Sequence, residues 1–213
     1  RRVLFRSSKA ELIIAMTKTP LGAPITVNGF KDKEMISLCF IAAKMGHNIT
    51  VTIEGLAELE TIIEVNQEFN EGIENPISPK IGVRIRLHSS GIGIWAKSGG
   101  YSSKFGLTST ELLEAYEMLK KHALLDSLWM IHFHIGSQMG DIAPLKKALR
   151  EAGNIYAELK KRGANALGAI NIGGGLAVEY SQHSHSQERN YSLKEFANDV
   201  IYLMQEISKR KGV

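Results

Sequence analysis

The side chains best suited to chemistry are two histidines that close an apolar segment in the middle of the chain. Residues 128–137 read Leu-Trp-Met-Ile-His-Phe-His-Ile-Gly-Ser. The large and branched apolar residues predict a buried strand over residues 128–134, and alternation along that strand places His132 and His134 on one face. An imidazole is costly to bury unless something binds it. These two histidines therefore need partners.

His134 ends the predicted strand, where α/β folds place their chemistry. It could act as an acid or base, or stack on a flat ligand. The alternative is a core histidine bonded to a backbone carbonyl. His132 lies one pleat deeper, and we assign it a structural role.

Three consecutive glycines follow the next predicted strand and could hold an anion. Gly173, Gly174 and Gly175 come directly after residues 167–172, and backbone amides without a neighbouring Cβ can approach a phosphate closely. Ser137 could donate a hydrogen bond to the same phosphate. The alternatives are a tight turn for the glycines and a turn or helix cap for the serine. The spacing does not match Gly-x-Gly-x-x-Gly, so a dinucleotide fingerprint is not supported.

Arg84 and Arg86 share one face of a predicted strand over residues 81–87. A barrel would bury that face, so at least one of the two charges is expected to meet an anion or a carboxylate. Residues 89–105 then follow, rich in glycine and serine with isolated aromatics, a composition typical of a mobile lid. A long surface loop is the alternative.

No metal site is predicted. His183 and His185 lie in a polar loop, but neither has a carboxylate or cysteine at metal-ligand spacing, so a solvated loop is preferred. Cys39 is the single cysteine, which excludes an intrachain disulfide framework and fits a reducing compartment. Its position in an apolar helical pattern indicates a small core residue. We expect a cytoplasmic protein.

The composition is that of a globular domain. Of 213 residues, 44% are hydrophobic and 23% are charged, enough for one sizeable core. No apolar run approaches the roughly 18 residues that a membrane span needs, and the N-terminus lacks the pattern of a secretory signal. We therefore predict no membrane partner.

The first seven residues carry most of the basic excess. Residues 1–7 read Arg-Arg-Val-Leu-Phe-Arg-Ser, and one reading frame of a widely used short-read sequencing adapter encodes this string. We interpret the segment as an adapter artefact and exclude it from the fold. Without its three arginines the formal net charge falls from +4 to +1. The argument for a nucleic-acid partner falls with it.

Helical and strand patterns alternate through the remaining residues. A helix over residues 8–16, with a capping box from Ser8 and Glu11, precedes five strand–helix units. The predicted strands are 24–28, 48–53, 81–87, 128–134 and 167–172, and the helices that follow them are 32–45, 57–69, 108–122, 143–162 and 193–209. This alternation predicts a parallel sheet with crossover helices.

A (β/α)₈ barrel has eight such units in about 250 residues. We therefore predict an α/β fold, an incomplete (β/α)₈ TIM-type barrel over residues 8–213 that lacks its first strands and its last strand. A doubly wound open sheet is the alternative.

Several motifs resemble the fold-type III pyridoxal-phosphate decarboxylases. They are His-Phe-His-Ile-Gly-Ser-Gln at 132–138, Asn-Ile-Gly-Gly-Gly-Leu at 171–176 and Ser-Lys-Phe-Gly-Leu at 103–107. Ornithine, diaminopimelate and arginine decarboxylases share these signatures. The finer resemblance is to the biosynthetic arginine decarboxylases, through Val-Asn-Gly-Phe-Lys-Asp-Lys-Glu at 27–34 and Gly-Val-Arg-Ile-Arg-Leu at 82–87.

The resemblance implies a role for each candidate residue. It gives His134 the stacking position on the pyridine ring of pyridoxal 5′-phosphate (PLP), and it gives Ser137 and Gly173–Gly175 the phosphate. It places Arg84 near the cofactor. It implies that a small-molecule amino acid is approached by the segment that contains Ile170, Asn171, Leu176, Glu179 and Tyr180.

The resemblance also implies the activity and what lies outside the chain. The activity would be conversion of L-arginine to agmatine and CO₂ in polyamine and spermidine biosynthesis, by a homo-oligomer that also uses Mg²⁺. The Schiff-base lysine would lie upstream, and the glutamate at the pyridine nitrogen would lie downstream with a C-terminal β-domain. The chain alone is therefore expected to be inactive and to fold poorly.

Two alternatives stay open. The first is a related decarboxylase acting on ornithine or diaminopimelate. The second is a non-catalytic regulatory homologue, which would lack the lysine on the first barrel strand.

Overall fold

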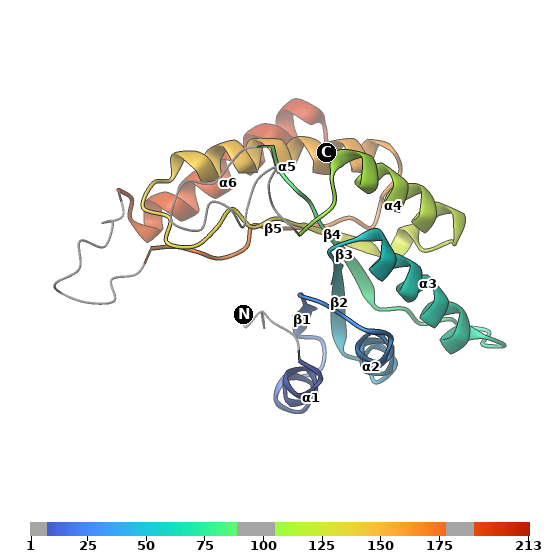
Figure 1. The fold of residues 1–213 in the computed structure, drawn as a ribbon. Helices are drawn as coiled ribbons and strands as arrows, with labels where there is room; N and C mark the ends of the chain where they lie inside the picture. Colours follow the sequence, from blue (N-terminus) through green and yellow to red (C-terminus); the bar gives the residue numbers. More distant parts are fainter. Residues whose placement is uncertain (1–7, 89–104, 178–189) are drawn as a thin grey trace.

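A computed structural model of the chain describes residues 8–88, 105–177 and 190–213. Helices and strands alternate along the chain (Figure 1), as the sequence predicts. In order they are α1 (Lys9–Lys18), β1 (Pro24–Val27), α2 (Lys33–Lys44), β2 (Asn48–Ile53), α3 (Leu56–Asn70), β3 (Lys80–Arg84), α4 (Ser109–Lys121), a 3₁₀ turn (Leu125–Ser127), β4 (Leu128–His132), α5 (Ala143–Lys161), β5 (Ala169–Asn171) and α6 (Leu193–Lys211).

The five strands form one parallel sheet in the order β1-β2-β3-β4-β5. Each strand therefore pairs with the next one along the chain, whereas a doubly wound sheet reverses its order at a switch point. In Figure 1 the sheet curls through an open arc, and α3, α4 and α5 lie on its outer side. The structure is an incomplete (β/α)₈ barrel, and the doubly wound alternative is wrong.

The two faces of the sheet have opposite character. Register partners share a face, and one such row contains Thr52, Gly82, Met130 and Ala169. The next row, toward the carboxyl ends of the strands, contains Arg84, His132 and Asn171. The inner face is thus polar at its carboxyl end. The outer face joins the helices in the hydrophobic core, with Ile25, Val27, Ile49, Val51, Ile53, Ile81, Val83 and Ile131 all buried.

Side-chain caps define where several helices begin. Capping boxes, in which a hydroxyl and a glutamate satisfy each other's backbone amides, start α1, α4 and α6, and each such cap contributes about 1 kcal/mol. The pairs are Ser8 with Glu11, Thr108 with Glu111 and Ser192 with Glu195. The capping box predicted at the first helix is confirmed.

Four of the five strands are shorter than the sequence predicts, and β1 ends at Val27, one residue earlier than predicted. β3 ends at Arg84 because the chain then pairs with Leu107: the Arg86 amide donates to the Leu107 carbonyl at 2.8 Å. β4 ends at His132, four residues before Gly136, which has a φ of +118°. Glycine adopts such a φ readily, so the backbone can leave the sheet. β5 begins at Ala169, two residues later than predicted.

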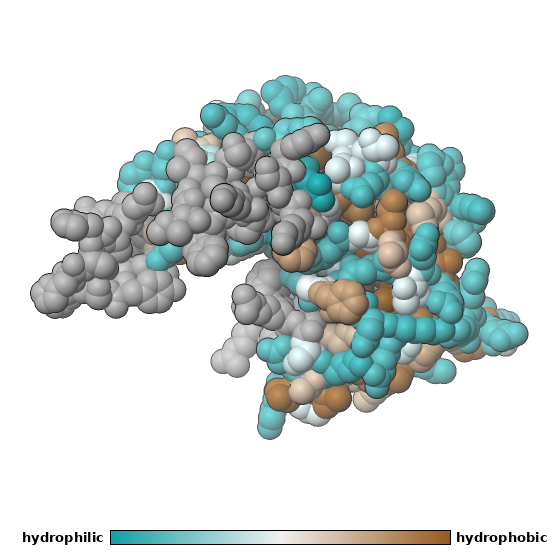
Figure 2. All heavy atoms as spheres, in the orientation of Figure 1, coloured by the Kyte–Doolittle hydropathy of each residue, from teal (hydrophilic) through white to brown (hydrophobic). Residues whose placement is uncertain are grey.

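The outer surface is mainly hydrophilic along α5 and α6, at the top of Figure 2. Exposed apolar side chains near the N-terminus, around α1 and α2, include Ile13, Ile14, Phe30, Ile41 and Met45, and α6 also exposes Leu193, Ile201 and Tyr202. Over the part of the chain that the structure describes, no helix is both long and apolar enough to cross a membrane.

Candidate cofactor site at the carboxyl ends of the strands

The turns that follow β4 and β5 lie in direct contact. A Cβ placed on Gly173 would lie 2.8 Å from His134 Nδ1, and one on Gly175 would lie 2.0 Å from the Gly136 carbonyl oxygen. Gly173 and Gly175 also have φ angles of +73° and +104°. Only glycine satisfies both the space and the backbone angle at these positions. The glycine run therefore brings its backbone against the histidine segment.

Further contacts hold the two turns together. The Met139 amide donates to the Gly175 carbonyl at 2.9 Å, and Met139 forms a parallel bridge with Leu176. A Cβ on Gly175 would lie 3.1 Å from the Ser137 Cα, so the serine lies beside this glycine. The structure thus brings the serine, the histidine and the three glycines to one place.

This place offers hydrogen-bond donors to an anion. Gly174 is exposed, and a Cβ placed on it would meet nothing within 4 Å. Among the described residues, none accepts a hydrogen bond from the amides of Gly174 or Gly175, whereas the Gly173 amide donates to Asn171 Oδ1 at 3.0 Å. The exposed Ser137 adds a hydroxyl. Such a group of amides and a hydroxyl suits a phosphate.

His132 is buried and has a structural contact. Its Nδ1 lies 3.0 Å from the Asn171 carbonyl oxygen, so Nδ1 carries the proton and donates. Burial is the main cause that lowers the pKa of His132 to about 4. The neutral ring therefore ties β4 to β5 through this hydrogen bond.

His134 is partly buried beside the glycine run. Burial, and then the positive charge of Arg84, lower the pKa of His134 below its usual 6.5. The imidazole is consequently neutral near pH 7. A neutral flat ring suits stacking on an aromatic ligand.

Arg84 follows the same inner face, as the register partner of His132. Its Nη1 donates to Glu54 Oε1 at 3.0 Å, and both side chains are largely buried, with 14% and 11% exposed. The guanidinium also lies 5.3 Å from the Phe105 ring centroid. The prediction that one of the two arginines meets a carboxylate is confirmed. Glu54 was not among the predicted residues, although its position directly after a β-branched strand was a usable signal.

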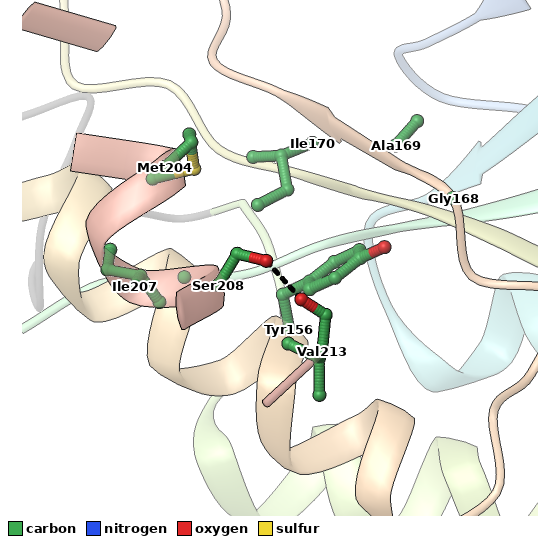
Figure 3. A pocket seen from close by; sticks show the side chains of 9 residues that line it. Tyr156, Gly168, Ala169, Ile170, Met204, Ile207, Ser208 and Val213 are labelled. Carbon is green, nitrogen blue, oxygen red and sulfur yellow. Dashed lines mark hydrogen bonds between the residues drawn. The ribbon is translucent and has the colours of Figure 1, made fainter. Parts of the chain in front are cut away.

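The predicted substrate segment divides between the two faces. Asn171 faces the site, where its side chain holds the Gly173 amide. Ile170 is on the opposite, helix-facing side and lines a cavity of about 360 Å³ with Tyr156, Met204 and Val213 (Figure 3). The structure does not bring Ile170 into the cluster. Glu179 and Tyr180 lie outside the described residues, as do His183, His185 and most of the predicted lid.

The donors present fit PLP, which has a flat ring and a phosphate. Among the described residues, the space beside Gly174 is open and is bordered by the amides of Gly174 and Gly175 and the Ser137 hydroxyl, so it would receive the phosphate. The neutral His134 ring would lie against the pyridine. Residues 8–88, 105–177 and 190–213 contain no group of three or more His, Cys, Asp or Glu side chains that could hold a metal ion.

Comparison with known proteins agrees with this geometry. The chain is 46% identical to the biosynthetic arginine decarboxylase of Geobacter sp. strain M21 and 40% identical to that of Rhodopirellula baltica, over 97% of its length in each case. It spans 32% and 30% of those relatives.

Solved structures give the same result. The biosynthetic arginine decarboxylase SpeA of Campylobacter jejuni matches with 56% identity and a TM-score of 0.82, over 96% of this chain and 32% of that one. Diaminopimelate decarboxylase of Helicobacter pylori matches with 26% identity and a TM-score of 0.61, over 85% of this chain and 42% of that one.

The family model described as "Pyridoxal-dependent decarboxylase, pyridoxal binding domain" matches residues 6–213, nearly the whole chain. This match agrees with the half-barrel fold and with the glycine-lined site, which both fit a domain that binds pyridoxal phosphate. The chain belongs to the pyridoxal-dependent decarboxylases, and it carries their pyridoxal-binding domain.

Proposed function

We propose that the chain is the PLP-binding part of a biosynthetic arginine decarboxylase, which converts L-arginine to agmatine and CO₂ in polyamine biosynthesis. The contact between the Gly173–Gly175 turn and the segment after β4 that contains His134 is the observation that carries the proposal. The choice of arginine is supported by the names of the relatives at 40–56% identity. Because the chain spans about a third of those relatives, the activity belongs to a longer polypeptide.

Each residue has a defined task in this proposal. The amides of Gly174 and Gly175 and the hydroxyl of Ser137 hold the phosphate, while the neutral ring of His134 packs on one face of the pyridine. Arg84 adds positive charge on the same side of the sheet. PLP itself supplies the electron sink that lets the substrate lose its carboxylate as CO₂. His134 would keep water from its face of the ring and fix the ring's orientation.

The substrate residues stay a proposal from the family resemblance. Asn171, Leu176, Glu179 and Tyr180 would border the amino acid. Ile170 would act only through its backbone, because its side chain lines the cavity on the other face. We assign covalent attachment of PLP to none of the described lysines. Lys31 lies near the site, but its side chain is fully buried and pairs with Glu58.

The decisive experiment uses the complete gene product that carries this chain. We expect CO₂ release from L-arginine that depends on added PLP, with little release from ornithine or diaminopimelate. Release only from one of those two amino acids would overturn the choice of substrate. PLP binding without CO₂ release from any of the three would instead favour the non-catalytic homologue.

The remaining expectations are also proposals. We propose a homo-oligomer in the cytoplasm, which sedimentation and fractionation of the complete protein would test. A requirement for Mg²⁺ is supported only by the family resemblance, and we assign no step to the ion. We retain the adapter interpretation of residues 1–7, with residues 8–213 as the partial barrel domain. Unrelated codons in the source nucleotides would overturn it.

A further inference from the structure

A buried ion pair joins the loop that follows β1 to the first turn of α3. The Nζ of Lys31 lies 3.2 Å from Glu58 Oε2, with the lysine side chain fully buried and the glutamate side chain 12% exposed. Glu58 also accepts from two backbone amides, that of Lys31 at 3.1 Å and that of Glu54 at 2.7 Å. One carboxylate therefore fixes the loops that follow β1 and β2.

This pair connects to the cofactor site through the backbone of Gly29. The Lys31 ammonium donates to the Gly29 carbonyl oxygen, and the Gly29 amide donates to Glu54 Oε1 at 3.2 Å. The same carboxylate oxygen of Glu54 holds Arg84 Nη1 at 3.0 Å. A continuous set of contacts thus runs from Lys31 to the guanidinium.

The charges suggest a purpose for burying a lysine here. Taking a charge out of water is expensive, and hydrophobic residues of similar size often stabilise a fold equally well. Stability alone therefore does not explain why a lysine is buried at this position. The four side chains Lys31, Glu54, Glu58 and Arg84 carry two positive and two negative charges, which balance within this set of contacts.

We infer that Lys31 and Glu58 are positioning residues for the cofactor site, which set the place of Arg84 through Gly29 and Glu54. This inference rests on the proposed function, because Arg84 is taken to face PLP. Arg84 is also the charge that both histidines of the site experience. A displaced guanidinium would change the affinity for PLP and the titration of His134 together.

The test compares Lys31→Met with Lys33→Met in the complete gene product. Lys33 is the matched control, because it stands two residues on and pairs with the exposed Glu64 and Glu68 at the surface. We expect Lys31→Met to weaken PLP binding about tenfold, by analogy with the loss of an outer-shell partner at a metal site. Lys33→Met should bind PLP as the unaltered protein does.

Two further readouts separate positioning from a general loss of stability. In an Arg84→Met background, Lys31→Met should cause no additional loss of PLP affinity, because the effect passes through the arginine. Without PLP, NMR titration of labelled histidines should show a higher pKa for His134 in Lys31→Met. If Lys31→Met fails to fold, Glu58→Gln replaces it, since an amide keeps an acceptor but loses the charge.

The outcomes are distinct. Additive losses in the double variant, or an unchanged His134 titration, would overturn the positioning role. Failure of the unaltered protein to bind PLP would overturn the proposed function, and the histidine titration would still decide the positioning role.

Discussion

Two histidines, one at the end of β4 and one just after it, are both held neutral, but for different uses. His132 is buried and donates from Nδ1 to Asn171, so its proton serves the connection between β4 and β5. His134 is only partly buried and lies beside Gly173, where an aromatic ligand can reach it. Two positions along the chain thus separate a histidine with a structural role from a histidine that is proposed to bind the cofactor.

The low pKa of His132 makes stability depend on pH. Its folded-state pKa of about 4 lies below 6.5, the value without burial. Between these values the unfolded chain binds more protons, so this stabilisation is complete above pH 6.5 and is lost as the pH falls toward 4. When the pH falls from 7 to 5, the free energy of unfolding, measured by urea denaturation, should decrease by about 2 kcal/mol more in the unaltered protein than in His132→Gln. Substitution of the exposed His88 by glutamine is the control, and an equal pH dependence in His132→Gln would contradict the assignment.

The glycine run allows a second prediction from single residues. Gly175→Ala would place a Cβ 2.0 Å from the Gly136 carbonyl oxygen at a φ of +104°. The backbone strain alone should lower the free energy of unfolding by about 1–3 kcal/mol, and PLP binding should be lost. Gly174→Ala is the matched variant, because its Cβ would meet no atom of the described residues within 4 Å. Equal stability losses in the two variants would contradict the close contact between the turns.

The residues of the site could be predicted because glycine, histidine and serine at strand ends are visible in the sequence. For Glu54 the only signal was its position directly after a β-branched strand, and many solvated acids share that position until Arg84 is known to face it. Ile170 shows the opposite problem. Alternation along β5 places it on the face opposite Asn171, and the family resemblance alone had grouped the two.

Among the elements, the helices were predicted more closely than the strands. Helix starts depend on local side chains, such as Ser8 with Glu11, which the sequence displays directly. Strand ends depend on what the neighbouring strand does. β3 stops at Arg84 because Leu107 takes over the pairing, and no pattern within residues 81–87 reveals that partner.

The cap of α4 gives a prediction at the element scale. The Thr108 hydroxyl accepts from the Glu111 amide and donates to Glu111 Oε2, so Thr108→Ala removes these two contacts and leaves the bond from the Thr108 backbone amide to Glu111 Oε2. We expect the free energy of unfolding to fall by about 1 kcal/mol, measured by urea denaturation. Ser109→Ala changes the next, exposed residue and should cost clearly less. A cost for Thr108→Ala no larger than that control would show that the cap adds nothing.

For the molecule as a whole, the open arc leaves β1 and β5 at the two edges of the described sheet. Unpaired backbone groups on such edges invite association with other chains. Residues 8–213 expressed alone should therefore release no CO₂ from arginine and should elute as aggregates in size-exclusion chromatography. A soluble monomer that unfolds cooperatively would contradict this expectation.

The order of the strands also bears on how the polypeptide acquires its shape during synthesis. Since β2 pairs with β1, β3 with β2, and so on to β5, each new strand meets a partner that the ribosome has already released. The register partners Pro24 and Asn48 still lie 24 residues apart, and Ile81 and Leu128 lie 47 apart, so each pairing is non-local and folding of such a parallel sheet is slow. Within this sheet, every strand except the first is completed by pairing with a segment made before it.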